Sequence, residues 1–183
     1  TVTLSVFAWP ALAGNTLYLQ NATIRVPQIK AARDGHVVFK PVPQTKFYII
    51  QFQSSIPESS KSKLMETGVE FGSYIPDDGM LAKIDGEESW NTLNKMSEVR
   101  NVIPYRPELR LSRDWQPLSV FSQDQMERAL VRLFSAQEYN SFLNELDQRR
   151  LAVQVEQVYT NLVSIRATRY TMDIIKSIEG VEW

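Results

Sequence analysis

Residues 47–52 read FYIIQF, and residues 69–84 read VEFGSYIPDDGMLAKI. The first stretch is β-branched and aromatic, which is typical of a buried strand. The second stretch alternates apolar with polar or small residues on both sides of Pro76-Asp77-Asp78-Gly79, a set of turn-forming residues. We expect the glycine to supply the positive φ of this turn. Together the two stretches predict a strand followed by a β-hairpin.

Helical patterns lie on both sides of this hairpin. Pro57 fits the first turn of a helix, Leu64 lies on its apolar face, and Gly68 ends it. Apolar residues at every third position from Trp90 to Met96 predict a second helix, and residues 99–105 read as a final strand. The predicted order is therefore β-α-β-β-α-β.

The same apolar pattern returns when the chain is shifted along itself by 82 residues. The second copy contains Ser135 and Glu138 at capping-box spacing, and Thr160-Asn161 as a possible turn. It ends in a helical stripe and the start of a last strand at Val181. The shift superimposes Phe52 on Phe134, Leu64 on Leu146, Leu81 on Val163, and Val99 on Val181.

The predicted fold class is α+β, with two tandem ferredoxin-like (βαββαβ) modules. Each module is an antiparallel sheet with two helices on one face, and the other face is left open to solvent or to a partner. The domains are expected to be an N-terminal arm at 14–45 with a possible strand at 17–26, a first module at 46–105, a linker at 106–125, and a second module at 126–183 whose last strand is truncated.

Residues 1–13 read TVTLSVFAWPALA, an apolar and uncharged stretch that ends in a small-x-small pattern. This is typical of the end of a secretory signal peptide, and it predicts a protein that is secreted or held in the cell envelope. The alternative is an N-terminal strand or helical turn that packs on the domain.

Composition argues against several classes of function. Lys and Arg total 20 against 21 Asp and Glu, so a nucleic acid or an anionic membrane is not expected as a partner. There is no cysteine, and His36 is the only histidine, so thiolate sites and sites with two imidazoles are excluded. No G-x-S-x-G motif accompanies any serine, so no catalytic triad is expected. No phosphate-binding or dinucleotide-binding glycine motif occurs, and no cofactor or metal is expected. Asp77 and Asp78 could touch Ca²⁺, but the sequence offers too few further oxygen ligands nearby.

Short motifs resemble the propeptides of subtilisin-like serine proteases. In those propeptides the first strand reads Y-I-V-x-F, one subgroup has a Y-I-P-D hairpin, and the last strand reads P-x-V-x-x-V. Here the corresponding residues are 47–52, 68–69, 74–78 and 99–102, and residues 178–183 resemble the last strand once more. The second copy departs from the pattern because it has no Y-I-P turn.

This resemblance implies a non-catalytic pro-region of a serine endopeptidase precursor. The partner is the cognate protease domain in cis, downstream of Trp183, and the open sheet face packs on two of its helices. The pro-region then acts as an intramolecular chaperone and inhibitor. Asp77 and Asp78 are the candidates to cap helix N-termini of the partner, and Tyr74, Tyr105 and Trp183 complete the candidate interface.

Two other functions remain open at the level of sequence. The chain could be a stand-alone exported binding or inhibitor module, or a small-molecule sensor made of tandem ferredoxin-like domains.

Overall fold

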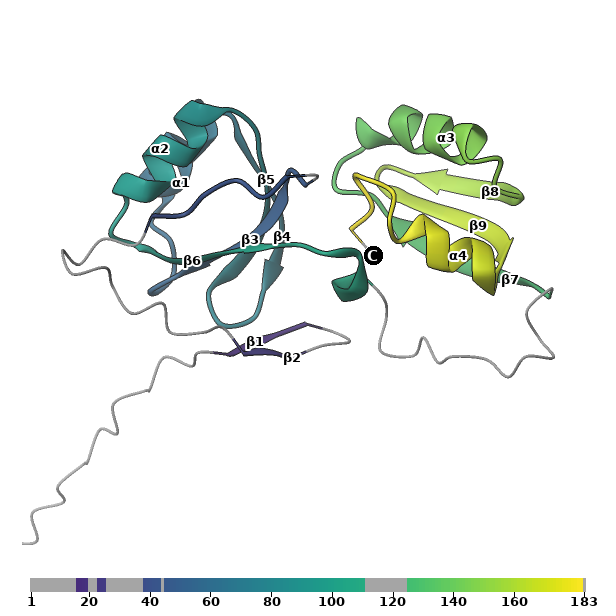
Figure 1. Cartoon of the computed structure of the whole chain (residues 1–183), viewed down its shortest axis with the longest axis horizontal. Coiled ribbons are helices and arrows are strands. Elements are labelled where there is room, and N and C mark those ends of the chain that lie inside the picture. Colours follow the sequence, from purple (N-terminus) through teal and green to yellow (C-terminus); the bar gives the residue numbers. More distant parts are fainter. Residues whose placement is uncertain (1–15, 20–22, 26–37, 44, 111–124, 183) are drawn as a thin grey trace, which may run out of the picture.

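The computed structural model describes residues 16–19, 23–25, 38–43, 45–110 and 125–182. Over these residues the chain is α+β, with four α-helices, one four-stranded and one three-stranded antiparallel sheet, and a small two-stranded hairpin (Figure 1). The predicted signal peptide at 1–13, His36 and Trp183 lie outside the described residues.

The four-stranded sheet and two helices occupy residues 47–104, and we call this unit the first module. Its strands lie in the order β4-β5-β3-β6, and every neighbouring pair is antiparallel. The predicted β-α-β-β-α-β order of elements is confirmed here. The elements are β3 (Phe47–Phe52), α1 (Glu58–Glu66), β4 (Val69–Ile75), β5 (Gly79–Ile84), α2 (Glu87–Lys95) and β6 (Val99–Pro104).

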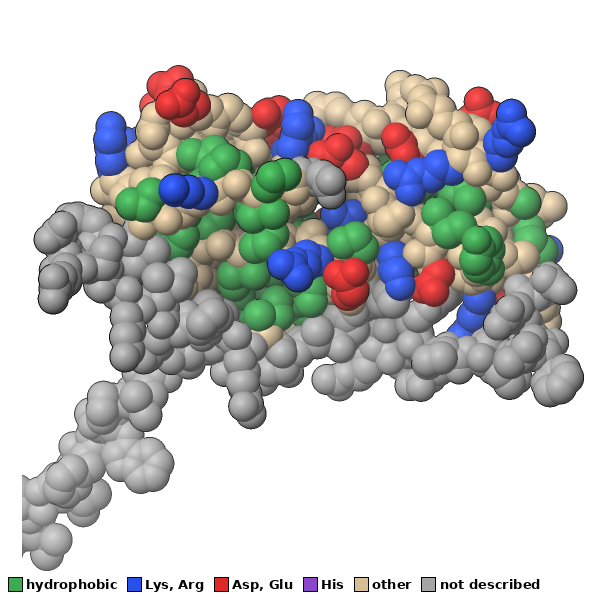
Figure 2. All heavy atoms as spheres, viewed as in Figure 1, with side chains coloured by type: hydrophobic (Ala, Val, Ile, Leu, Met, Phe, Trp, Pro, Cys, Tyr) green, Lys and Arg blue, Asp and Glu red, His purple; other side chains and the backbone are tan. Residues whose placement is uncertain are grey.

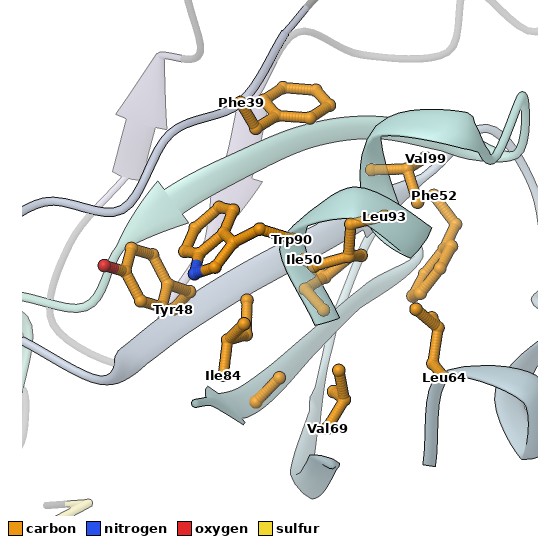
Figure 3. Packing of buried hydrophobic residues seen from close by; sticks show 11 residues of the cluster. Phe39, Tyr48, Ile50, Phe52, Leu64, Val69, Ile84, Trp90, Leu93 and Val99 are labelled. Atoms are coloured by element: carbon orange, nitrogen blue, oxygen red, sulfur yellow. The ribbon is translucent and has the colours of Figure 1, made fainter. Parts of the chain in front are cut away.

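The first core lies between α1, α2 and one face of this sheet (Figure 3). Trp90 of α2 meets the Tyr48 ring edge-on, with ring centroids 4.9 Å apart. Leu64 of α1 and Phe52 of β3 are also buried. Full burial of such side chains contributes roughly 1.5–3 kcal/mol each.

Helix α1 begins and ends close to the predicted positions. Pro57 immediately precedes its first residue, and the Pro57 carbonyl accepts hydrogen bonds from the first turn. Gly68 has φ 94° and donates its N–H to the Met65 carbonyl, at 3.0 Å. Glycine adopts this left-handed conformation without a steric cost, which explains why the helix ends there.

The three-stranded sheet and the other two helices form the second module, over residues 126–182. Its strands lie in the order β7-β9-β8. The last strand predicted at Val181 is a single bridge to Leu133, beyond the end of β7. The elements are β7 (Met126–Arg132), α3 (Glu138–Gln148), β8 (Val153–Tyr159), β9 (Leu162–Thr168) and α4 (Arg169–Ile175).

The predicted capping box at α3 is wrong. The helix begins at Glu138 with Gln137 as its N-cap, and no side chain caps it. The Glu138 carboxylate instead accepts a hydrogen bond from Lys83 of β5, at 2.7 Å. This charge-assisted contact between the modules takes the carboxylate that a capping box would use.

The N-terminal arm forms a hairpin where a single strand at 17–26 was expected. β1 (Thr16–Tyr18) pairs with β2 (Thr23–Arg25), and Leu17 lies opposite Ile24. The predicted linker also contains structure, because a short 3₁₀ helix, η1 (Pro107–Leu109), follows β6. Residues 111–124 of that segment lie outside the described residues.

The two modules correspond to each other, but the gapless shift does not hold in their strands. Phe52 donates its N–H to the carbonyl of the hairpin turn and pairs with Val99. In the second module Leu133 makes the same two contacts. Its N–H donates to the Asn161 carbonyl in the β8–β9 turn, and the residue pairs with Val181. Leu133 is therefore the equivalent of Phe52, and Phe134 points to the opposite face.

Candidate interaction surface

Tyr74, Asp77 and Asp78 lie together on the β4–β5 hairpin. The positive φ of the turn falls on Asp77 (68°) and Asp78 (58°), so the expectation that Gly79 supplies it is wrong. Aspartate tolerates this region because its short side chain can bond locally. The turn is held on β3 by Gln51, whose side-chain amide donates to the Asp77 carbonyl at 3.2 Å.

The hairpin presents an exposed surface. The Tyr74 side chain is 65% exposed, and Asp77 is exposed beside it. An exposed carboxylate on a fixed turn is able to accept N–H groups from a partner's helix N-terminus.

Tyr105 is separated from these residues and is buried between the two modules. Its hydroxyl donates to the backbone carbonyl of Glu182, at 2.8 Å. Burial raises the pKa of this phenol well above its ordinary value. A buried hydroxyl with a partner inside the chain cannot reach an external protein, so Tyr105 joins the modules.

Arg110 completes the contact between the modules, and sequence reasoning placed it in the linker. The guanidinium lies 5.6 Å from the centre of the Tyr105 ring. It donates to the carbonyls of Ile178 at 2.7 Å and Lys176 at 3.1 Å, in the turn that follows α4. Burial lowers the pKa of Arg110. An arginine between two leucines in a polar segment gives no sequence signal for such a role.

Phe134 packs on the outer face of the first sheet, which is the face opposite its helices. Its ring lies 5.1 Å from that of Phe47 in an edge-on arrangement. It also lies against Gly72, where an added Cβ would come within 2.7 Å of the ring. Only glycine permits this close approach at β4.

An ion pair lies at the same junction. Lys83 of β5 and Glu138 of α3 are mostly buried, with side chains 23% and 14% exposed. Figure 2 shows basic and acidic side chains lying together where the two modules meet.

The outer face of the first sheet is therefore covered within the chain. Phe134 from the second module and Leu17 from β1 bury this face, whose cluster also includes Phe47, Ile49 and Leu81. The expectation that this face stays open to a partner is wrong for the first module. The outer face is covered because it is apolar, and exposure of a contiguous apolar surface to water is unfavourable in free energy.

On the outer face of the second sheet, large apolar side chains are exposed among the described residues. Leu130 of β7 is 53% exposed and Tyr159 of β8 is 54% exposed. They border a shallow hollow of about 650 Å³ that is also lined by Arg128, Glu156, Gln157 and Ser164. We call these six residues the outer patch.

Charges on the outer patch are arranged around one carboxylate. Glu156 accepts a hydrogen bond from Arg128 at 2.7 Å, and Arg166 of β9 lies 3.4 Å away. The Arg128 bond in particular lowers the pKa of Glu156. Arg128 and Arg166 share one carboxylate, so these three side chains together carry a net positive charge.

The described residues contain neither a cluster of metal ligands nor a membrane-spanning helix. Among the residues that the structure describes, no three His, Cys, Asp or Glu side chains gather in a way that could hold a metal ion. Within the same part of the chain, no helix combines the length and apolar character needed to cross a membrane.

Comparison with known proteins gives one family match. Residues 18–106 match the model of a family described as a domain of unknown function (DUF8729). The match begins at Tyr18, the last residue of β1. It covers β2 and the first module, and it ends before η1. No curated protein matches the chain. No solved structure matches it either.

Proposed function

We propose that this chain is the non-catalytic pro-region of a secreted subtilisin-like serine protease, made of two tandem ferredoxin-like modules. It acts as an intramolecular chaperone and inhibitor by packing a sheet on the protease domain. The motifs at residues 47–52 and 74–78 support this proposal, together with the alternation of helices and antiparallel strands in both modules.

Strand order supports the ferredoxin-like assignment of each module. The first sheet reads β6-β3-β5-β4, so the first strand of the module is flanked by its fourth and third. The second sheet reads β7-β9-β8, and the bridge of Val181 to Leu133 puts the start of a fourth strand on the free side of β7. Both modules thus follow one order, with both helices packed on one face.

The observation that carries the proposal is the difference between the two outer faces. The first sheet uses its outer face to hold the second module, whereas the outer patch of the second sheet stays exposed. A docking function needs one accessible sheet face, and the second module provides it. We infer that the second module meets the protease, and that Tyr74 and Asp77 offer a separate contact.

The test is refolding of a denatured subtilisin-like protease domain in the presence of the intact chain. Recovery of peptide hydrolysis should be faster with the chain than without it. Leu130→Asp should remove the acceleration, because it replaces an apolar contact with a charged side chain that must be desolvated on docking. Met65→Asp is the matched control, since Met65 of α1 is equally exposed on another surface.

Two results would overturn the proposal. One is unchanged refolding together with undetectable binding to the protease domain. The other is acceleration that Leu130→Asp and Met65→Asp reduce to the same degree, because the outer patch would then have no specific role.

A stand-alone exported inhibitor would use the same open face. It differs in acting on a protease that is already folded. Strong inhibition of a mature protease without any effect on refolding would favour that function.

A further inference from the structure

We propose that the free edge of β8 binds an extended segment of the partner protein, rich in acidic and apolar residues, as an added strand. This inference rests on the proposed function, because it describes how the partner on the second module is held.

Strand β8 is the edge of the second sheet. The sheet order β7-β9-β8 leaves one side of β8 without a paired strand among the described residues. Val155 and Val158 are also 38% and 45% exposed, although they lie opposite the buried residues Ile165 and Val163 of β9. Both valines lie on the face of the second core, and Tyr159 lies in the outer patch on the other face. The strand therefore offers apolar contacts on both of its faces.

The backbone of β8 has groups available for pairing. Tyr159 and Leu162 are partners on either side of the two-residue turn, so this pair exchanges the hydrogen bonds of the hairpin. Pairs alternate along an antiparallel ladder, which turns the N–H and C=O of the neighbouring Val158 away from β9. These two groups point to the free edge, where an added strand would bond to them.

The edge has few of the features that prevent strand addition. Natural edges are commonly protected by lysine, proline, bulges or covering segments. β8 contains neither lysine nor proline, and its one charged residue, Glu156, is held by Arg128. The bulge between Val155 and Gln157 limits continuous pairing, so we expect the main-chain bonds of a guest strand at Val158.

The edge strand of the first sheet differs in this respect. Gly72 of β4 lies against Phe134, and Ser73 accepts a hydrogen bond from Arg132 at 3.3 Å. Part of β4 is therefore covered by the second module, while β8 stays accessible.

The positive charge beside β8 favours an acidic segment as the added strand. Arg128 and Arg166 share the single carboxylate of Glu156 beside the edge, and this leaves a positive excess that an acidic segment would neutralise. A second copy of this chain would bring two positive surfaces together across the edge, which disfavours self-pairing.

The experiment uses the full chain and two synthetic ten-residue peptides with valine or leucine at alternating positions. One peptide has aspartate and glutamate between the apolar residues, and the other has lysine and arginine. Binding is followed by fluorescence anisotropy, and exchange of the Val158 amide hydrogen by nitrogen-15 NMR. The acidic peptide should bind more tightly and should slow exchange at Val158.

Two variants of one residue isolate the main-chain contribution. Val158→Pro removes the edge N–H and leaves the β8–β9 ladder intact, so binding should weaken roughly three- to tenfold, as the loss of one hydrogen bond implies. Val158→Thr keeps the N–H and should bind nearly as the parent does. The exchange measurement on the parent protein needs no variant, so it tests the proposal even if Val158→Pro does not fold.

Each contrary result has its own meaning. Failure of both peptides to bind, binding without slower exchange at Val158, or equal binding of the two peptides would overturn the proposed strand addition. Protection of Val158 that grows with protein concentration alone would show pairing with a second copy instead. If the acidic peptide binds at β8 but the chain does not assist protease refolding, the proposed function fails and the inference of strand addition stands.

Discussion

Glu182 shows how a single residue depends on the contact between the modules. The residue is only 4% exposed, and burial is the main cause that raises the pKa of its carboxyl above the ordinary value. A bond with Ser73 and the charge of Arg132 act in the opposite direction. The buried site therefore favours the neutral acid.

This environment predicts a pH dependence of stability. A raised pKa in the folded state means that the contribution of Glu182 is fully present below the unfolded pKa and is lost as pH rises through the folded pKa. The free energy of unfolding should therefore fall as pH rises above about 4.5, and Glu182→Gln should reduce this fall. Urea unfolding at several pH values measures this pH dependence of the free energy of unfolding. Glu66→Gln, on the exposed side of α1, is the control. An equal pH slope in parent and Glu182→Gln would contradict the prediction.

At the scale of an element, the β4–β5 turn has an unusual backbone. Both central aspartates have left-handed backbone angles, which β-branched residues adopt only with strain. Asp77→Val should lower the free energy of unfolding by about 1–2 kcal/mol. Asp77→Gly should be neutral or stabilising, because glycine adopts the same angles freely.

Chemical denaturation measures both effects. Tyr74→Val is the control, since Tyr74 lies in a strand of the same hairpin and is exposed. A loss with Tyr74→Val that equals the loss with Asp77→Val would show that the cause is not the backbone angle.

The order of the helices and strands follows the prediction, but the register of the strands in the second module does not. Helices and strands were predictable because their periodicity is local: Trp90 and Leu93 mark α2, and residues 47–52 mark β3. Register depends on pairing between distant segments, and a slip of one residue moves a side chain to the other face. The shift of 82 residues therefore matched Phe134 to Phe52, whereas Phe134 lies on the opposite face of its strand and is found between the modules.

The corrected correspondence between the two modules also explains why one outer face is covered and the other is exposed. By hydrogen-bond register, Ile49 and Leu81 of the first sheet correspond to Leu130 and Ser164 of the second. Phe47 likewise corresponds to Arg128. The first outer face is apolar and is covered, whereas the second carries charged and hydroxyl groups and stays in water.

At the scale of the whole molecule, the junction predicts a single cooperative unit. Phe134, Arg110 and the Lys83–Glu138 pair connect the modules through buried contacts. Calorimetry of the parent chain should show one transition whose calorimetric and van't Hoff enthalpies agree.

Phe134→Ala should break this cooperativity. Loss of a buried phenylalanine costs about 3–5 kcal/mol, and the transition should shift to lower temperature and separate into two. Tyr170→Ala is the control, because Tyr170 is 71% exposed. Two transitions in the parent chain, or unchanged cooperativity in Phe134→Ala, would contradict this.

The sequence alone determined the α+β class, the order of the elements, and features such as the end of α1 at Gly68, because each depends on residues close together in the chain. The β4–β5 hairpin was predicted for the same reason. The sequence did not show that Tyr105 and Arg110 join the modules, nor which outer face remains open. Those outcomes were decided by the tertiary structure, because they depend on the face to which a side chain points and on what segment covers it. The outer patch and the edge of β8 are candidates for function because the packing of the two modules covers the first outer face and leaves these two surfaces exposed.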